Sequence, residues 1–333
     1  EGKAVITYSF KDLYDEVEKV AHALRTLGVV KGDRVAGYIP NIPESVIAML
    51  ATASIGAIWS SSSPDFGTKA VLDRFAQIEP KVIFAADGYF YNGKGYSSIK
   101  KLKEISKNIP ALQKVIVVEY LNEEPELLDE VSSIRYKDFI NCSPEPLYFE
   151  QLPFDHPLYI MYSSGTTGLP KSIVHSAGGT LIQHLKELYF HCDLVREDCI
   201  FYFTTCGWMM WNWLVSSLAS GSTIVQFDGS PFYPDGKELW KLSEKLGITV
   251  FGTSAKYIES CKESGIRPLE FTKLSKLRLI LSTGSPLMDE SFDYVYQCIK
   301  QDVLLGSISG GTDIISCFAL SNPMLPVTRG ELQ

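Results

Sequence analysis

Apolar positions recur along the chain with helical spacing in some segments and as short unbroken blocks in others. Within residues 9–27 they stand three or four residues apart, at Leu13, Val17, Val20, Leu24 and Leu27, which predicts a helix with one apolar face. Ser9, followed three residues later by Asp12, predicts a capping box at the start of this helix, and Gly28 predicts its end. Pro43 predicts the first residue of a second helix, over residues 43–55.

The same alternation continues along most of the chain. Strands are expected at residues 34–39, 57–60, 82–85, 115–118, 158–162, 173–175, 200–203, 223–227, 250–251, 279–281 and 303–305. Further helices are expected between them, at 68–77, 97–107 and 177–189 among others. Short apolar strands separated by helices are typical of parallel sheets in a layered α/β fold. We therefore predict an α/β protein with two mainly parallel β-sheets and flanking helices.

Residues 121–157 interrupt this rhythm because they are rich in Glu and Pro. Such a composition is typical of a surface connection between two folded parts. We therefore predict a first α/β subdomain over residues 1–120, a connecting segment over 121–157, and a second α/β subdomain over 158–333.

Composition narrows the classes of function. Of the 333 residues, 45% are hydrophobic and 21% are charged, which is ordinary for a globular protein. The net charge of −8 argues against a nucleic-acid partner, and no apolar run is long enough to span a bilayer. The seven cysteines form no Cys-x-x-Cys pair, so we expect reduced thiols in a cytosolic protein and no structural zinc site. The sequence gives no indication of the oligomeric state.

The richest candidate chemistry lies in the string YSSGTTGLPK, residues 162–171. Its glycines let backbone N–H groups approach an anion closely, its hydroxyls can donate to phosphate oxygens, and Lys171 adds a compact positive charge. The spacing from Gly165 to Ser172 is that of a P-loop, but Pro170 offers no N–H, and the segment after Lys171 is predicted to be a strand rather than a helix. We therefore predict a polyphosphate-binding loop of another kind.

This string resembles the signature of the adenylate-forming superfamily, which includes acyl-CoA synthetases, luciferases and the adenylation domains of peptide synthetases. Residues 53–67 (ASIGAIWSSSSPDFG), 281–287 (LSTGSPL) and 306–314 (GSISGGTDI) resemble further segments of the family, so the likeness extends along nearly the whole chain. It implies an AMP-forming acid–thiol ligase that uses ATP, Mg²⁺ and CoA.

The resemblance also implies roles for individual residues. The ATP phosphates would be bound by Ser163, Ser164, Gly165, Thr166, Thr167, Gly168 and Lys171. Adenine and AMP would be bound by Gly284, Ser285 and Pro286 and by the run Ser307, Ile308, Ser309, Gly310, Gly311 and Thr312. Thr312 would contact the α-phosphate and act in catalysis with Lys171. Asp313 would hold Mg²⁺, where relatives carry a Glu that is one methylene longer.

Several strings, among them HSAGGTLIQHLKE and GWMMWNW, resemble the acetoacetate-activating branch of the family more than the acetate-activating branch. Acetate-activating relatives close the acyl pocket with a tryptophan at the position of Gly310, so its absence implies a longer acid. Trp208, Met209 and Met210 would line the same pocket, although Met and Trp at a helix start are as often core residues. The predicted acid is acetoacetate, a four-carbon 3-oxo acid.

The resemblance implies that the family's mobile C-terminal domain, with its adenylation lysine, lies outside these residues, so we expect the chain alone to have little synthetase activity. It also implies use of ketone-body carbon for lipid synthesis in the cytosol. Three alternatives stay open at this point: another short- or medium-chain acyl-CoA synthetase, an adenylation domain that loads a carrier protein, or an inactive truncated nucleotide-binding chain.

Overall fold

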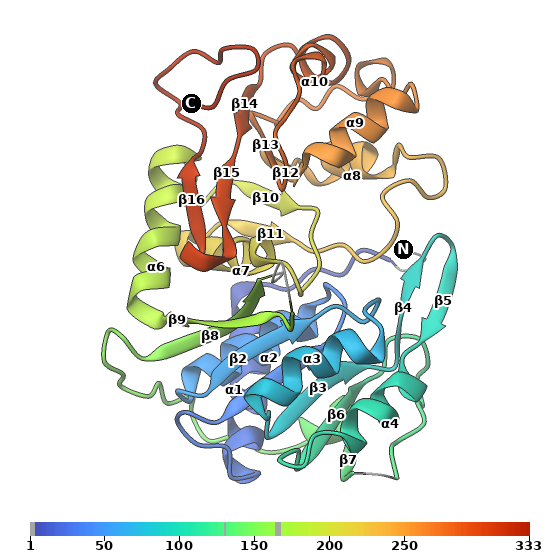
Figure 1. Ribbon diagram of the computed structural model, residues 1–333, viewed down its shortest axis with the longest axis vertical. Coiled ribbons are helices and arrows are strands. Elements are labelled where there is room, and N and C mark those ends of the chain that lie inside the picture. Colours follow the sequence, from blue (N-terminus) through green and yellow to red (C-terminus); the bar gives the residue numbers. More distant parts are fainter. Residues whose placement is uncertain (1–3, 130, 164–167) are drawn as a thin grey trace. The chain divides into compact units, whose positions relative to one another are not determined.

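The computed structural model describes residues 4–129, 131–163 and 168–333 (Figure 1). Within these residues the chain divides into two units. The first contains the chain up to Gly179 together with Thr205–Trp208, and the second contains Thr180–Thr204 and Met209–Gln333.

The first unit is built on a seven-stranded sheet in the order β7-β6-β3-β1-β2-β8-β9. Its strands are β1 (Arg34–Tyr38), β2 (Ile58–Ser62), β3 (Val82–Ala86), β6 (Lys114–Val118), β7 (Ser133–Arg135), β8 (Pro157–Ser163) and β9 (Lys171–Ser176). Neighbouring strands are parallel except β8 and β9, which are antiparallel. A separate hairpin pairs β4 (Gly88–Tyr91) with β5 (Lys94–Ser97).

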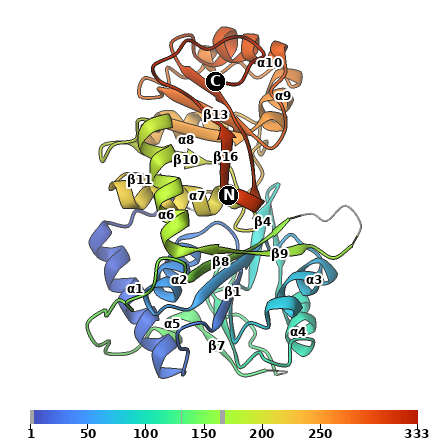
Figure 2. The same cartoon turned by 60° about the vertical axis from the view of Figure 1, so that its left-hand side comes forward.

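Helices cover both faces of this sheet. They are α1 (Phe10–Thr26), α2 (Pro43–Ser54), α3 (Thr68–Ile78), α4 (Ile99–Lys107) and α5 (Tyr136–Phe139). Figure 2 shows α1, α2 and α5 on one side and α3 and α4 on the other. The strands are consequently buried on both faces, and β3 has no exposed position, which explains why they appear in the sequence as unbroken apolar blocks.

Local signals in the sequence fix the ends of two of these helices. The capping box predicted for α1 is confirmed: Ser9 Oγ accepts a hydrogen bond from the Asp12 amide at 3.1 Å, and Asp12 Oδ2 accepts one from the Ser9 amide at 2.8 Å. Pro43 is the first residue of α2, where its missing N–H leaves no helical hydrogen bond unmade.

Strands β8 and β9 belong to the first sheet, although the sequence grouped residues 158–179 with the second subdomain. Trp59 in β2 pairs with Tyr159 in β8, and β9 continues the sheet beyond β8. The chain therefore leaves the first unit after Gly179, later than the boundary expected at residue 157. A strand that joins a distant part of the sheet carries no local signal of which sheet it will join.

The second unit contains a parallel five-stranded sheet in the order β11-β10-β12-β13-β14. Its strands are β10 (Cys199–Tyr202), β11 (Thr223–Val225), β12 (Val250–Ser254), β13 (Leu279–Thr283) and β14 (Leu304–Ser307). A short antiparallel hairpin, β15 (Ser309–Gly311) and β16 (Ser316–Ala319), follows β14. The two mainly parallel sheets confirm the predicted fold class.

The α-helices of this part are α6 (Ala177–Lys186), which begins at the end of the first unit, α7 (Met209–Ser216), α8 (Glu238–Leu246), α9 (Ala255–Glu263) and α10 (Asp289–Tyr294). The shorter turns are the π-helical η1 (Glu187–His191) and η4 (Val295–Ile299) and the 3₁₀-helical η2 (Ser217–Ser220), η3 (Pro268–Glu270) and η5 (Thr312–Ile314). None of the helices in the described residues is both long enough and apolar enough to cross a membrane.

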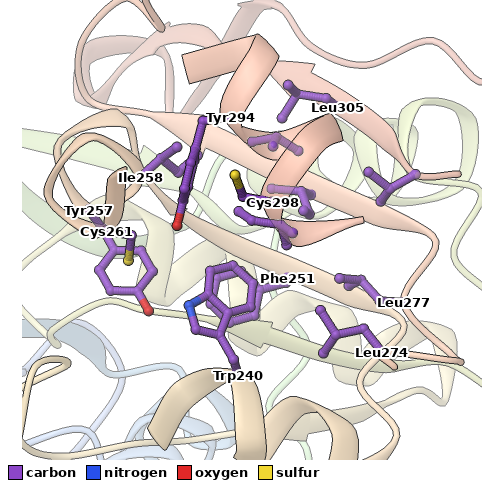
Figure 3. Packing of buried hydrophobic residues seen from close by; sticks show 14 of the residues in the cluster. Trp240, Phe251, Tyr257, Ile258, Cys261, Leu274, Leu277, Tyr294, Cys298 and Leu305 are labelled. Atoms are coloured by element: carbon purple, nitrogen blue, oxygen red, sulfur yellow. The ribbon is translucent and has the colours of Figure 1, made fainter. Parts of the chain in front are cut away.

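An aromatic core fixes one face of this sheet (Figure 3). Trp240 of α8 stacks on Phe251 of β12 with 4.6 Å between ring centroids, and Tyr257 of α9 lies against both rings. Stacked aromatic pairs contribute beyond the area they bury. This core holds β12, β13 and β14 in register, and their carboxyl ends carry the candidate nucleotide site.

Candidate functional site

The predicted phosphate loop connects β8 to β9. Ser163, the last residue of β8, is the register partner of Lys171, the first residue of β9, and the Lys171 side chain is exposed. A strand follows Lys171, which confirms that this is not a P-loop. Among the described residues, and apart from its chain neighbours, Gly168 has no heavy atom within 4 Å of where a Cβ would stand. The predicted ligands Ser164, Gly165, Thr166 and Thr167 lie outside the described residues.

Tyr162, the first residue of the motif, anchors the strand that enters this loop. Its hydroxyl lies 3.1 Å from Ser60 Oγ, and the Arg74 guanidinium carbon lies 5.7 Å from its ring centroid. Burial raises the pKa of Tyr162 well above its ordinary value, so the phenol is protonated at neutral pH. The residue is an anchor for β8 rather than an acid or base.

Gln77, near the end of α3, fastens the strand that leaves the loop. Its Nε2 donates to the carbonyl oxygen of Pro170 at 2.9 Å, and its Oε1 accepts from Ser172 Oγ at 3.1 Å. The two bonds bracket Lys171, so they tie the backbone of the candidate catalytic lysine to a helix. The sequence could not indicate this role, because a single exposed Gln on a helix has no distinguishing pattern.

The predicted adenine segment lies at the carboxyl edge of the second sheet. Gly284, Ser285 and Pro286 follow β13 directly and are exposed, while Ser307 ends the neighbouring strand β14. The Ile308 amide donates to the carbonyl oxygen of Ser282 at 2.8 Å, which joins the two segments. Gly284 has φ +91°, a left-handed conformation that favours glycine. Ligands of parallel α/β sheets bind at this edge, so the two predicted nucleotide segments occupy the expected position.

Gly310 is constrained by the β15–β16 hairpin. A Cβ at Gly310 would stand 2.3 Å from the carbonyl oxygen of Ser316 and 2.7 Å from Cys317 Cα. Both neighbours are backbone atoms of the partner strand, so no side-chain rotation relieves the contact. The glycine predicted to enlarge an acyl pocket is therefore also required by the hairpin.

We expect Gly310→Ala to lower the free energy of unfolding by about 1–3 kcal/mol, the usual cost of overpacking. Gly311→Ala is the matched control, since the nearest atom to its added Cβ would be Asp313 Oδ2, at 4.0 Å. Urea unfolding of both variants measures the difference. Equal stability of the two variants would contradict the hairpin constraint.

Thr312 and Asp313 form the loop of this hairpin, within η5. Thr312 is half-buried, whereas Asp313 is exposed. The turn closes with a hydrogen bond from the Ile315 amide to the Thr312 carbonyl oxygen at 3.1 Å. Both side chains predicted to act on the α-phosphate and the metal thus lie on one short turn after β14 and β15.

The residues predicted to line the acyl pocket differ in their surroundings. Trp208 is half-buried at the end of the Thr205–Trp208 segment of the first unit. Met209 and Met210 open α7 in the second unit and are buried, with Met210 only 4% exposed. Burial of this kind is typical of the core as well as of a pocket wall, so the role of these residues in binding an acid stays a prediction.

A comparison with known protein families matches residues 3–329 to the family described as AMP-binding enzyme. The chain belongs to the AMP-binding enzyme family. The resemblance inferred from the sequence motifs is therefore confirmed.

Three relatives show how far the likeness extends. Acetoacetyl-CoA synthetase of Mus musculus is 51% identical over 100% of this chain and 51% of its own length. Acetoacetyl-coenzyme A synthetase of Rhizobium meliloti (strain 1021) is 53% identical over 100% of this chain and 51% of its own length. The solved structure of acetoacetyl-CoA synthetase from Streptomyces lividans matches 98% of this chain and 50% of that chain, with a TM-score of 0.93 and 46% identity. The chain spans about half the length of the relatives it matches.

Asp313 is the residue that the sequence predicts to bind the metal expected for an AMP-binding enzyme. Within the described part of the chain, no group of three or more His, Cys, Asp or Glu side chains could hold a metal ion. Mg²⁺ does not require such a group, since it is commonly bound by one or two carboxylates together with substrate phosphates and water. The exposed carboxylate of Asp313 fits that mode of binding.

Proposed function

We propose that the protein activates acetoacetate with ATP and transfers the acyl group to CoA, as an AMP-forming acid–thiol ligase. The observation that carries this proposal is the 51–53% identity to acetoacetyl-CoA synthetases over the whole of the chain. The position of the Thr312–Asp313 turn at the carboxyl edge of a parallel sheet supports it, because that edge is where such folds bind nucleotides.

A fourth relative supports the proposed class of acid. Malonamoyl-CoA synthetase vrtB of Penicillium aethiopicum is 42% identical over 98% of this chain and 48% of its own length. A malonamoyl group and an acetoacetyl group both carry a second carbonyl at carbon 3, and they differ by an amino group in place of a methyl group. The shared chemistry favours recognition of a 3-carbonyl acid rather than of a simple alkanoate.

In the first proposed step, a carboxylate oxygen of the acid attacks the α-phosphorus of ATP and the bond to the β-phosphate oxygen breaks. The products are the acyl-adenylate and pyrophosphate. Lys171 and the loop hydroxyls of Ser163, Ser164, Thr166 and Thr167 would bind the phosphates, while Thr312 would donate to the α-phosphate. Mg²⁺ bound by Asp313 would neutralise charge on the phosphates. Such catalysis rests on positioning and charge neutralisation.

In the second proposed step, the CoA sulfur attacks the acyl carbon. The carbon–oxygen bond to AMP breaks, AMP leaves with the electron pair, and the thiol proton passes to solvent. Gly284, Ser285 and Pro286 would retain the adenine through both steps. No covalent bond between the acid and the enzyme is required.

We also propose the cytosol as the place of action. The seven cysteines, all within the described residues, are free. Free thiols suit a reducing compartment.

The substrate is tested by acid-dependent exchange between ATP and pyrophosphate, measured on the full-length gene product with acetoacetate, malonamate, acetate, butyrate and octanoate. We expect exchange with acetoacetate at least about tenfold above that with acetate and butyrate, since buried polar partners of the 3-carbonyl would be left unpaired by an alkanoate. Stronger exchange with malonamate or an alkanoate would show that this acid, and not acetoacetate, is the substrate. No exchange with any acid, from folded protein, would contradict the proposed enzyme activity.

A further inference from the structure

The hairpin that carries Thr312 and Asp313 is held by a buried polar cluster on α6 and η1. In both views β16 runs beside α6 (Figures 1 and 2). Each end of the turn is attached differently. Its first residues continue from β14 at the sheet edge, whereas its last residues meet side chains from α6 and η1.

Glu187, at the start of the π-helical turn η1, is the centre of this cluster and is 1% exposed. Its Oε1 accepts hydrogen bonds from the Cys317 amide at 3.1 Å, from Cys317 Sγ at 3.2 Å, from Gln183 Nε2 at 3.0 Å and from Ser316 Oγ. Its Oε2 accepts one from Trp213 Nε1 at 2.9 Å. Three of these bonds therefore come from Ser316 and Cys317, the first two residues of β16.

The carboxyl group of Glu187 is charged at neutral pH. Burial by itself would raise its pKa, but the hydrogen bonds from Ser316, Cys317 and Gln183 outweigh burial and lower the pKa below its ordinary value. An ionised carboxylate only accepts hydrogen bonds. Its partners are accordingly all donors, and hydrogen bonds to a charged acceptor are the stronger kind.

A second contact reaches the residue between the turn and β16. His184 Nε2 lies 2.8 Å from the carbonyl oxygen of Ile315, so this nitrogen carries the proton, and Nδ1 lies 2.8 Å from Ser216 Oγ. Ile315 is buried and has φ +48°. A β-branched residue in this left-handed conformation is strained, and such strain persists only where the surroundings enforce it.

We propose that Glu187 is a positioning residue for the reaction: through Ser316 and Cys317 it fixes the strained end of the hairpin loop, and thereby sets where Thr312 and Asp313 present their side chains. This proposal rests on the proposed function, because it gives Thr312 and Asp313 their roles. A buried charge is costly to retain unless its hydrogen bonds are satisfied, and here three of those bonds come from Ser316 and Cys317.

The first test is a double-mutant cycle in the exchange assay, on the full-length gene product, with acetoacetate as the acid. Glu187→Gln keeps the shape but lacks the charge. We expect it to lower kcat/KM for ATP about tenfold and to raise the Mg²⁺ concentration for half-maximal rate, the scale seen when a group that orients a metal ligand is changed. In an Asp313→Asn background the same change should no longer shift the Mg²⁺ concentration for half-maximal rate, because the side chain through which it acts on the metal is already replaced.

Asp198→Asn is the matched control. Asp198 is a buried carboxylate of the same unit, bound to Arg278 at 2.6 Å and to the Val195 amide at 2.8 Å. It precedes β10, at the amino edge of the sheet, and makes no hydrogen bond to the hairpin among those of the described residues. We expect the kcat/KM of Asp198→Asn for ATP to stay within about twofold of that of the unmodified protein, since a loss of stability at a separate position does not change the site in the folded protein. Equal losses for Asp198→Asn and Glu187→Gln, or an undiminished Mg²⁺ shift in the Asp313→Asn background, would overturn the proposal.

Amide hydrogen exchange tests whether Glu187 holds the end of the hairpin loop, independently of any catalytic activity. Glu187→Gln should speed exchange of the Ile315–Cys317 amides at least about tenfold while leaving Leu279–Thr283 of β13 unchanged, because local opening exposes only the local amides. Equal acceleration in β13 would show a general structural role and overturn the proposal.

If Glu187→Gln does not fold, Gln183→Met removes one donor to the same carboxylate and should show the same pattern more weakly. If the unmodified protein shows no pyrophosphate exchange with any of the acids tested, the proposed function fails. The amide exchange pattern would still show whether Glu187 holds the end of the hairpin loop.

Discussion

Asp313→Asn is expected to lower the rate of pyrophosphate exchange by the full-length gene product about 100-fold, the usual scale for removing one charge-stabilising group from a reacting centre. The neutral amide keeps the size of the side chain but binds Mg²⁺ far more weakly than a carboxylate does. The loss should be largest at low Mg²⁺ concentration and should shrink as Mg²⁺ is raised.

Asp313→Glu is the control for this prediction. It introduces the glutamate that the family resemblance implies for other adenylate-forming enzymes at this position. We therefore expect the rate to fall only about threefold, because the added methylene shifts the carboxylate. Because Asp313 is exposed, neither change should disturb folding. Full activity of Asp313→Asn at submillimolar Mg²⁺ would show that Asp313 does not bind the metal.

Glu187→Ala is expected to lower the free energy of unfolding by about 3 kcal/mol. The change leaves the indole N–H of Trp213 and the amide of Cys317 without acceptors, and each buried unsatisfied group costs about 1–3 kcal/mol. Chemical denaturation monitored by circular dichroism measures this loss. A loss below about 0.5 kcal/mol, the range of ordinary surface changes, would contradict the account of the cluster.

The contribution of Glu187 should also depend on pH. Its pKa is lower in the folded chain than its ordinary value, which is about 4.3 in an unfolded chain. The stabilisation is therefore complete above about pH 4.3 and is lost as the pH falls through the lower folded pKa. The difference in unfolding free energy between the unmodified protein and Glu187→Gln should be constant from neutral pH down to that region and then shrink. A difference that stays constant in stronger acid would show that the charge of Glu187 makes no contribution.

The sequence predicted those features that depend on neighbouring residues. The capping box of Ser9 and Asp12, the helix start at Pro43 and the strand after Lys171 each follow from a few adjacent side chains, and the structure confirms them. The hairpin of β4 and β5 was missed although its signal was present. Asn92 and Gly93 have φ +53° and +77°, and an Asn-Gly pair is the usual sign of such a turn.

Features that depend on distant residues could not be predicted. Glu187 contacts Ser316 and Cys317, which are more than a hundred positions away, and nothing around Glu187 in the sequence separates it from a surface glutamate. The constraint on Gly310 depends likewise on the backbone of β16. The motifs predict which residues bind ATP, but they do not indicate which residues hold that part of the chain in place.

The central claim is that acid activation proceeds through an adenylate, and it is tested most directly with acetoacetate labelled with ¹⁸O in its carboxylate. The full-length gene product, ATP, Mg²⁺ and CoA are incubated with this acid, and the products are analysed by mass spectrometry. Attack of the carboxylate on the α-phosphorus, followed by carbon–oxygen cleavage, predicts acetoacetyl-CoA, unlabelled pyrophosphate and AMP that carries one ¹⁸O. Formation of ADP with ¹⁸O in inorganic phosphate would show attack on the γ-phosphorus instead and would contradict the account.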